Sequence, residues 1–548
     1  MNVRSGRRAV NPIAVLLVLA LGTFMTLLDL TIVNVAIPSM LDGLHATLDQ
    51  ILWVLNAYSL AYAVLLITAG RLGDIVGPRN LFMLGMGIFT VASALSGLSH
   101  DPTQLILARA TQGVGAAILA PQGMPILLSV LSPQRRGLGF AMFGILAGLA
   151  VVAGPTVGGF IVTHFGWPWI FFVNLPLGVL TIALALLIVP DLRPGRPHRL
   201  DIPGVLLASA GLLGVVYGLI EGQRYEWGTV TRFITIPMII AVGVGLLALF
   251  VVYQASRQRN EPLLPFAVFS DRNFTISAIV LSALGFAIVG LYLPLTIYLQ
   301  SVLGLSAQDA GLTIAIQPLT TMFFSGMAGW LTQKVSGKYL LMPGLLLLAA
   351  GSAYIAWVAQ ADSSRWVFTP GLIVSGIGMG FIWTPIFSLA TRDLKPHLAG
   401  VASGVVSTIQ ELGAVIASAA VGALLQNQLA TALHAQAAQR AAQLPPAFRD
   451  QFVNGFGQAA KSGFEVGRGQ TGGSVDLPAG VPASAAHLVQ QVAHEVFTNA
   501  FTTAMRPSMA LPIAIVVLAA IACLKLRARG LATPVELRHE EEEPAAIA

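Results

Sequence analysis

Fourteen apolar segments of about twenty residues each recur along this chain of 548 residues. An apolar helix of about twenty residues matches the hydrocarbon thickness of a bilayer, where only helices and closed barrels satisfy every backbone polar group. The chain is 55% hydrophobic and 10% charged, whereas an ordinary soluble domain has about 25% charged residues. The pattern predicts an all-α integral membrane protein with fourteen transmembrane helices.

The spans have approximate limits, because apolar windows define helix ends only to within several residues. They are predicted at 13–38, 50–70, 81–99, 103–127, 137–162, 168–189, 202–221, 234–254, 274–299, 309–332, 338–359, 367–390, 400–426 and 507–526. Arg4, Arg7 and Arg8 precede the first span as they would in a secretory leader, but this run is too long for one. We therefore expect the first helix to be retained.

Basic residues are concentrated on one side of the predicted topology. An even number of spans puts both termini on that side, and its loops and tails hold 21 of the 30 lysines and arginines. The short loops on the other side hold three, Arg224, Arg232 and Arg365. Because cytoplasmic loops are enriched in basic residues, both termini are predicted to be cytoplasmic. This bias also explains the net charge of +6 without a nucleic-acid partner.

One long loop, residues 427–506, interrupts the series of spans and is predicted to lie outside. Its two ends have helical composition with amphipathic spacing, which favours helix 13 extending outward and an amphipathic segment leading into helix 14. Its middle is rich in Gly, Pro and Ser, which is typical of flexible loops. Two interpretations stay open, a tolerated surface insertion and a gate or docking surface for a partner.

Three charged residues lie deep inside predicted spans: Asp29, Arg109 and Glu411. A charge at the bilayer centre costs roughly 2.5–3.5 kcal/mol on insertion scales, so such residues usually pair or carry function. Arg109 stays charged and requires an anionic or carbonyl partner, for which Asp29 is the best candidate. Burial disfavours the charged form of a carboxyl group, so Asp29 and Glu411 could exchange protons or hold a lipophilic cation. A structural pairing of Asp29 with Arg109 is the alternative.

Two glycine-containing segments have the composition of moving helix junctions. The turn after the second span contains Gly70, Gly73, Asp74, Gly77 and Arg79. Its glycines permit a tight turn, and Asp74 could pair with basic residues of the turn or with a neighbouring helix end. Such contacts can hold one conformation, although a simple solvated turn is the alternative.

The fifth span contains Gly154, Pro155, Gly158 and Gly159. Proline frees a backbone carbonyl and bends a helix, and glycines let a second helix approach closely or slide. The segment suits a helix that moves, although a static kink explains it as well.

Four further polar or aromatic residues are candidates for lining a substrate cavity: Asn34, Tyr58, Gln317 and Trp383. Gln317 and Trp383 have prolines close by, Pro318 and Pro385. Aromatic faces suit flat cations, whereas ordinary packing is the alternative for each residue.

Several classes of function are disfavoured by what the sequence lacks. It has no phosphate-binding loop of the G-x-x-x-x-G-K-[ST] type, no H-E-x-x-H motif and one cysteine, Cys523. We therefore expect no enzyme activity, no resident metal, no cofactor and no transport driven by ATP hydrolysis in this chain.

Taken together, the motifs resemble those of the major facilitator superfamily. The segment "LDLTIVNVAIP" resembles the first-helix signature of its drug:proton antiporters, and 70–81, 105–117 and 148–159 resemble its motifs A, B and C. The resemblance runs from about residue 13 to 526, and the fourteen-helix multidrug efflux pumps are the most similar group. It implies two six-helix bundles of inverted repeats that alternate around a central cavity, with Arg109 in proton coupling and Pro155 in the antiport bend.

The implied organisation has five parts. These are a cytoplasmic tail at 1–12, an N-terminal bundle at 13–190, linker helices 7 and 8 at 191–255, a C-terminal bundle at 256–526 that includes the outer loop 427–506, and a cytoplasmic tail at 527–548.

The expected function is proton-driven export of lipophilic, often cationic, drugs or toxic compounds from a bacterial cell. The expected location is the inner or plasma membrane, and the expected partners are small lipophilic molecules, protons and membrane lipid. A periplasmic adaptor stays open, and otherwise we expect a monomer. A dedicated exporter of a lipid, siderophore or self-made antibiotic is the main alternative, and a receptor or scaffold that transports nothing is the remaining one.

Overall fold

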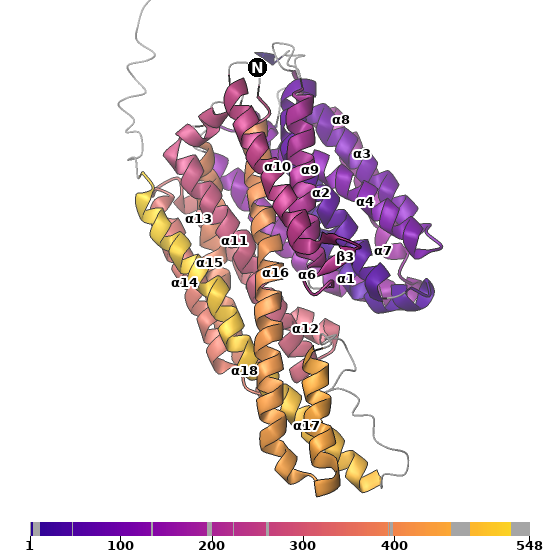
Figure 1. The fold of residues 1–548 in the computed structure, drawn as a ribbon. Coiled ribbons are helices and arrows are strands. Elements are labelled where there is room, and N and C mark those ends of the chain that lie inside the picture. Colours follow the sequence, from indigo (N-terminus) through magenta and orange to yellow (C-terminus); the bar gives the residue numbers. More distant parts are fainter. Residues whose placement is uncertain are drawn as a thin grey trace, which may run out of the picture.

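The computed structural model describes residues 2–3, 11–46, 48–132, 135–193, 200–222, 224–258, 262–392, 394, 398–461 and 483–527. Some side chains within these ranges are not described, that of Pro155 among them. Arg4, Arg7 and Arg8, the middle of the long loop and the acidic tail also lie outside the described residues. Figure 1 shows that the described chain is built almost entirely of long helices.

The N-terminal bundle corresponds to the first six predicted spans. Its helices are α1 (Pro12–Gly43), α2 (Leu48–Val76), α3 (Pro78–Gly97), α4 (Pro102–Leu119), the 3-10 turn η1 (Ala120–Gln122), α5 (Gly123–Val130), α6 (Arg136–Phe165), α7 (Trp169–Phe172) and α8 (Asn174–Ile188). Asn11 and Asp101 cap the starts of α1 and α4 by accepting backbone N–H groups, and a proline follows each cap. Such caps satisfy N–H groups that have no partner within the helix.

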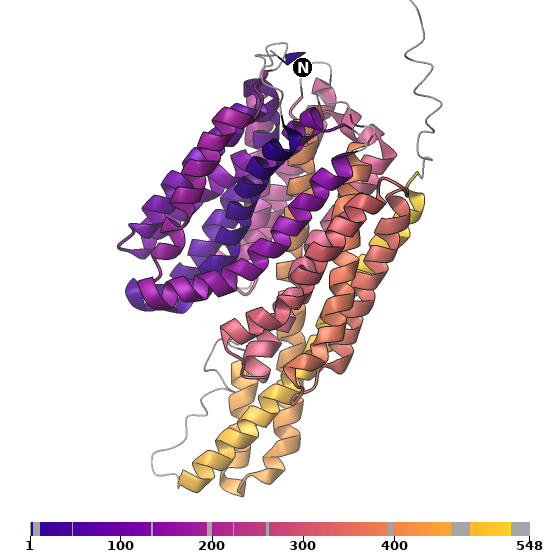
Figure 2. The same ribbon diagram turned by 180° about the vertical axis from the view of Figure 1, so that it is seen from behind.

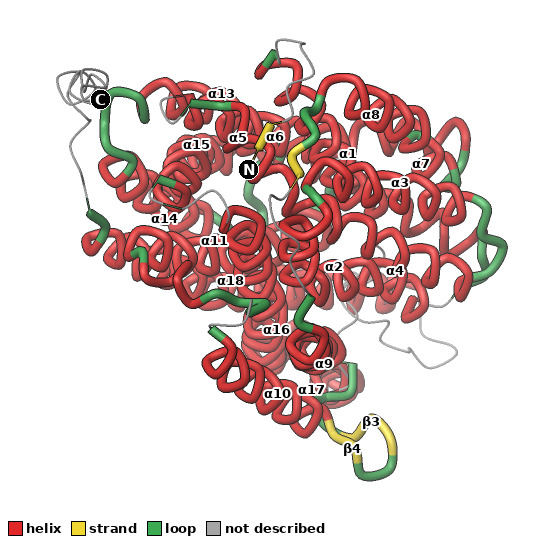
Figure 3. Tube along the Cα trace, turned by 90° about the horizontal axis from the view of Figure 1, so that it is seen from above, coloured by secondary structure: helices red, strands yellow, loops and turns green. Residues whose placement is uncertain are grey.

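A helical pair connects the two bundles. It consists of α9 (Ile202–Glu221) and α10 (Ile236–Arg257), which a short hairpin of β3 (Thr229–Thr231) and β4 (Ile234–Thr235) joins. A second antiparallel pair joins β1 (Asn2–Val3) to β2 (Leu192–Arg193). Figure 3 shows the β3–β4 hairpin at the edge of the molecule, beyond α10.

The C-terminal bundle follows, with a longer set of elements. They are η3 (Phe266–Ser270), α11 (Arg272–Ile297), the π-turn η4 (Tyr298–Val302), α12 (Ala307–Ile314), α13 (Ile316–Leu331), α14 (Lys338–Val358), η5 (Arg365–Phe368), α15 (Thr369–Thr391), α16 (Ala399–Arg440), η7 (Ala441–Gln443), α17 (Pro446–Lys461), α18 (Ala483–Ala522) and η8 (Cys523–Lys525).

Thirteen helices among the described residues are long and apolar enough to cross a membrane. The remaining predicted span, 309–332, is divided into α12 and α13 at Ala315. Pro318 explains the division, because it has no N–H for the carbonyl of Ile314 and its ring crowds that group. With α12 and α13 counted as one interrupted span, the arrangement agrees with the expected fourteen.

The two bundles contact each other near the end of the molecule where the described N- and C-terminal residues lie. There α2 packs on α16 and α6 packs on α13, and Phe140 of α6 stacks on Phe387 of α15 with ring centroids 5.5 Å apart. Figure 2 shows the two bundles diverging toward the opposite end. We refer to these two ends as the terminal side and the far side.

The long loop forms a helical extension on the far side (Figure 1). The end of α16, α17 and the beginning of α18 share a core that includes Leu433, Phe452 and Phe497 and continues into the C-terminal bundle. Arg440 also forms an ion pair with Glu495 across the extension. The predicted outward helix and the helix leading into the last span are both present.

Candidate functional site

Asp29 is at the centre of a fully buried polar network inside the N-terminal bundle. Its Oδ2 accepts a hydrogen bond from Arg109 Nη1 at 2.5 Å, and its Oδ1 accepts from Gln112 Nε2 at 2.9 Å and Asn174 Nδ2 at 3.1 Å. Asp29, Gln112 and Asn174 are each 0% exposed, and Arg109 is 1% exposed. Helices α1, α4 and α8 therefore meet at one charge-balanced carboxylate, and the expected pairing of Asp29 with Arg109 is present.

Arg109 has a second layer of contacts that holds its guanidinium group in place. Its Nη1 also donates to Gln112 Oε1 at 2.7 Å, and its Nε donates to the carbonyl of Val54 at 3.4 Å. The Tyr58 ring lies 4.4 Å from the guanidinium carbon, and the Phe171 ring lies 5.9 Å from it. Aromatic faces attract a cation electrostatically, so the buried arginine is stabilised by hydrogen bonds and by two rings.

Sequence reasoning missed three members of this network: Gln112, Asn174 and Ser93. Asn174 donates to Ser93 Oγ at 3.1 Å, and Ser93 donates to the Phe171 carbonyl at 2.9 Å. Gln112 could have been found, because it follows Arg109 by three residues and so shares its helix face. Asn174 is also polar within an apolar span, but nothing in the sequence places its helix beside α1.

Glu411 has very different surroundings. It lies on α16, its side chain is only partly buried, and it has no hydrogen bond or ion pair with any residue that the structure describes. The next turn of α16 packs Val415 against Ala63 of α2 and Val216 of α9. Glu411 is thus a free carboxyl group at the junction of the two bundles.

The Gly70–Leu81 segment forms the contact between α2 and the beginning of α16. Gly70 approaches Gly400 and Gly404 so closely that a Cβ atom at any of the three would overlap the opposing backbone. The Asp74 carboxylate lies against Gly400, in the first turn of α16. A helix N-terminus favours a negative charge, so the expected contact with a neighbouring helix end is present.

The other predicted residues of this segment have separate local roles. Gly77 has a φ of 101°, a conformation that side chains disfavour, and it joins α2 to α3. Arg79 donates to the carbonyl of Leu186 at 2.6 Å and so caps the end of α8. Gly73 lies against Gln122, which donates to the Ala69 carbonyl at 3.0 Å.

The three predicted glycines of α6, Gly154, Gly158 and Gly159, divide into two groups. Gly154 lies against Thr31 and Gly158 against Ile32, so both allow close packing of α6 on α1. A Cβ atom at Gly159 would meet no atom within 4 Å. The side chain of Pro155 lies outside the described residues, so the proposed bend stays a prediction.

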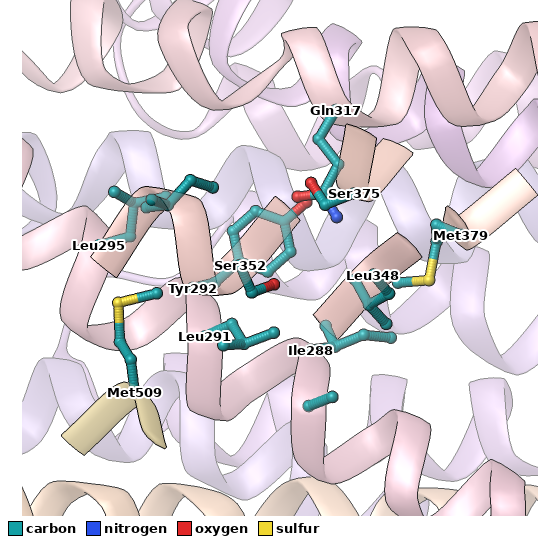
Figure 4. A pocket seen from close by; sticks show the side chains of 12 residues that line it. Ile288, Leu291, Tyr292, Leu295, Gln317, Leu348, Ser352, Ser375, Met379 and Met509 are labelled. Carbon is teal, nitrogen blue, oxygen red and sulfur yellow. The ribbon is translucent and has the colours of Figure 1, made fainter. Parts of the chain in front are cut away.

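The four candidate cavity residues lie in four different places. Asn34 is exposed and donates to the Leu30 carbonyl at 2.8 Å. Tyr58 lines no open space in this conformation, because its ring is buried beneath Arg109. Trp383 stacks on Phe387 with ring centroids 5.9 Å apart. Gln317 lines a pocket inside the C-terminal bundle (Figure 4).

Within the described residues, no group of three or more His, Cys, Asp or Glu side chains is placed to hold a metal ion. The three charged residues predicted deep inside spans instead form one neutralised pair, Asp29 with Arg109, and one carboxyl group, Glu411, that bonds to no residue that the structure describes. Such an arrangement can move a proton or hold a cation on Glu411 while the Asp29–Arg109 pair stays fixed.

Comparisons with known proteins agree with this architecture. The family model described as Major Facilitator Superfamily matches residues 19–418. A relative from Mycobacterium tuberculosis, "Uncharacterized MFS-type transporter Rv1250", is 38% identical over 82% of this chain and 78% of its own length. The "Tetracenomycin C resistance and export protein" of Streptomyces glaucescens is 30% identical over 78% of each chain.

A solved structure shows the same fold. The human organic anion transporter MFSD10 superposes with a TM-score of 0.55 and 14% sequence identity, covering 92% of this chain and 99% of that one. Family model, relatives and fold agree with the spans and motifs described above: the chain is a multi-pass membrane protein that belongs to the Major Facilitator Superfamily, a family of transporters rather than enzymes.

Proposed function

We propose that this chain is a proton-driven exporter that exchanges protons for lipophilic, often cationic, drugs or toxic compounds. The observation that carries the proposal is a contrast between two carboxyl groups. Glu411 bonds to none of the described residues, whereas the oxygens of Asp29 accept three hydrogen bonds. A free carboxyl group in an apolar helix binds either a proton or a cation, and this competition is the simplest basis for antiport. Its relatives include an export protein, which supports the direction of transport.

The exchange cycle follows from this competition. Ionised Glu411 attracts a lipophilic cation that enters from the cytoplasm. After the bundles alternate, a proton from the more acidic outer side neutralises Glu411 and the cation leaves. In this proposal Asp29 and Arg109 fix α1, α4 and α8 as one unit. They couple to the cycle through Tyr58 of α2, whose ring lies 4.4 Å from the guanidinium carbon of Arg109.

The contacts on the terminal side support an outward-facing assignment for this conformation. The α2–α16 contact at Gly70 and Gly404 and the α6–α13 contact hold the bundles together there. Basic residues lie at the same side, such as Arg71 near the end of α2 and Lys334 in the loop after α13. The positive-inside rule makes this the cytoplasmic side. In this proposal the protein resides in the bacterial plasma membrane with both termini in the cytoplasm.

The proposal needs no cofactor besides the proton gradient and no nucleic acid. The chain acts as a monomer in contact with membrane lipid. The extension on the far side is a place where a periplasmic adaptor could dock.

Efflux of ethidium from cells that express the chain tests the function. The proposal predicts efflux that stops when a protonophore dissipates the gradient, and that is lost in Glu411→Gln. Glu226→Gln is the matched control, because Glu226 is exposed in the loop between α9 and α10, and it should transport like the wild type. Ethidium efflux by Glu411→Gln at the wild-type rate, with equal expression, would refute the role of Glu411.

A dedicated exporter of a self-made antibiotic is the second candidate. The observation in its favour is the relative whose name refers to resistance and export of one compound, tetracenomycin C. A protein that folds in the membrane, exports no ethidium and still protects its host against one antibiotic would favour this candidate.

A further inference from the structure

We propose that the C-terminal bundle contains a second ligand subsite, which takes an uncharged aromatic group bearing a carbonyl or hydroxyl. This inference rests on the proposed export function and narrows its substrate class. It concerns the pocket around Gln317 (Figure 4), whose lining does not include Glu411.

The pocket lies between five helices of one bundle. About 360 Å³ of space free of protein atoms lies inside the pocket and at its mouth, part of it open to solvent. Its walls come from α11, α13, α14, α15 and α18, and the twelve side chains that line it include no charged group. Ile288 and Tyr292 of α11 are only partly buried, so the pocket has its opening along this helix.

Gln317 supplies the polar group at one wall of the pocket. It is 7% exposed, and its amide forms no hydrogen bond with any described residue. Figure 4 shows its side chain pointing toward Ser375 and Tyr292. The amide lines the pocket, so a polar group placed there can exchange hydrogen bonds with it. Because an amide both donates and accepts, it can recognise a carbonyl or a hydroxyl.

Two more hydroxyls are available beside it. Ser352 is 3% exposed, and neither its hydroxyl nor that of Tyr292 has a hydrogen-bond partner among the described residues. The remaining lining is apolar and includes Leu291 and Leu348. A charged group placed here would lose its hydration without an opposite charge to pair with. The lining therefore favours an uncharged group with one or two polar substituents.

The walls can adapt to such a group. Met379 and Met509 line the pocket, and methionine is flexible enough to fit different shapes. Gln317 also follows directly after the break between α12 and α13. A change in the angle between α12 and α13 at this break would move Gln317 relative to α14.

Protection of a cysteine inside the pocket tests the inference. In a Cys523→Ser background, Ser352→Cys is labelled with N-ethylmaleimide in the purified protein, with Nile red as the neutral probe and ethidium as the cation. We expect Nile red to slow labelling at Ser352→Cys by about tenfold, which corresponds to about 1.4 kcal/mol, and ethidium to leave it unchanged. Leu319→Cys is the control, because Leu319 is 44% exposed on α13 outside the pocket, and neither probe should protect it.

If N-ethylmaleimide does not label Ser352→Cys, the binding of Nile red is measured by its fluorescence instead. Gln317→Leu keeps the apolar volume and removes the amide, so it should weaken binding by about tenfold. Unchanged Nile red affinity in Gln317→Leu, or unprotected labelling at Ser352→Cys, would mean that the pocket holds water only and would overturn the inference.

The two proposals fail in different ways. If ethidium efflux depends on Glu411 but Nile red does not protect Ser352→Cys from labelling, the subsite is refuted and the proposed export function stands. Nile red protection without efflux of any compound would keep the subsite and contradict the exporter.

Discussion

Asp29 and Glu411 are both carboxylates within apolar helices, and their neighbours separate their roles. Asp29 is 0% exposed and paired with Arg109, so its charge is compensated within the bundle. Glu411 has no such partner among the described residues. The sequence could predict the Asp29–Arg109 pair, because two opposite charges in apolar spans require each other. It could not predict which carboxylate stays free, because that depends on Gln112 and Asn174 meeting Asp29 in space.

Removal of one charge of the Asp29–Arg109 pair should lower the stability of the protein more than removal of both charges. Arg109→Met leaves a buried carboxylate without its partner, which costs about 3–5 kcal/mol. The double variant Asp29→Asn with Arg109→Met removes both charges and should regain part of that stability. Thermal unfolding of the purified protein checks the order. A double variant less stable than Arg109→Met alone would contradict the account.

The pH dependence of transport should come from Glu411. The ionised form binds the cation, so efflux should decline when the cytoplasmic side is acidified, because protonation removes the charge that holds the substrate. Glu411→Asp should keep a pH-dependent rate, whereas Glu411→Gln should lose cation transport at every pH. The rate of ethidium efflux from right-side-out vesicles, whose interior is the cytoplasmic side, measures this pH dependence when the internal pH is set. A Glu411→Gln variant with the wild-type pH profile would show that another group titrates.

At the scale of the helix, α6 and the α12–α13 pair show how backbone chemistry sets packing. The glycines of α6 were predicted from sequence as a close-packing face, and Gly154 and Gly158 do approach α1. Gly159 does not approach another helix, because it lies on a face of α6 that has no neighbouring atom within 4 Å of its Cβ position. Pro318 was visible in the sequence, but its effect, a break at Ala315, depends on how the surrounding helices accommodate the freed carbonyl.

Substitutions at Gly154 and Gly159 should therefore differ. Gly154→Val would force a side chain into Thr31 of α1 and should abolish transport or lower expression. Gly159→Ala meets no atom within 4 Å, and it should stabilise α6 by about 0.5–1 kcal/mol because alanine favours helices over glycine. Efflux rates and thermal unfolding of both variants check this. Equal loss of function in both would contradict the packing described for α6.

At the scale of the whole molecule, the two bundles are joined on the terminal side and diverge toward the far side (Figure 2). The sequence predicted the bundles through the resemblance of its motifs to a known family. The conformation was not predictable, because the Gly70–Gly404 contact joins residues more than three hundred positions apart. The folded extension was predicted as helices, but its shared core around Phe497 required the structure.

A bulky side chain at the bundle contact should open the terminal side. Gly404→Leu would overlap the backbone of α2, whereas Gly422→Leu on the same helix would meet no atom within 4 Å of its Cβ position. Spin labels at Arg135 and Arg392, one on each bundle, report the separation. We expect Gly404→Leu to shift the distance distribution to longer values and Gly422→Leu to leave it unchanged. The same distribution in both variants would show that this contact does not hold the bundles together.

The most direct test of the central claim is the release of protons when substrate binds. Purified protein in weakly buffered solution at neutral pH is mixed with a lipophilic cation, and a pH dye records the protons that leave. If Glu411 binds proton and cation in competition, the wild type releases protons and Glu411→Gln releases none. Proton release by Glu411→Gln equal to that of the wild type would contradict the account and would assign the exchange to another group.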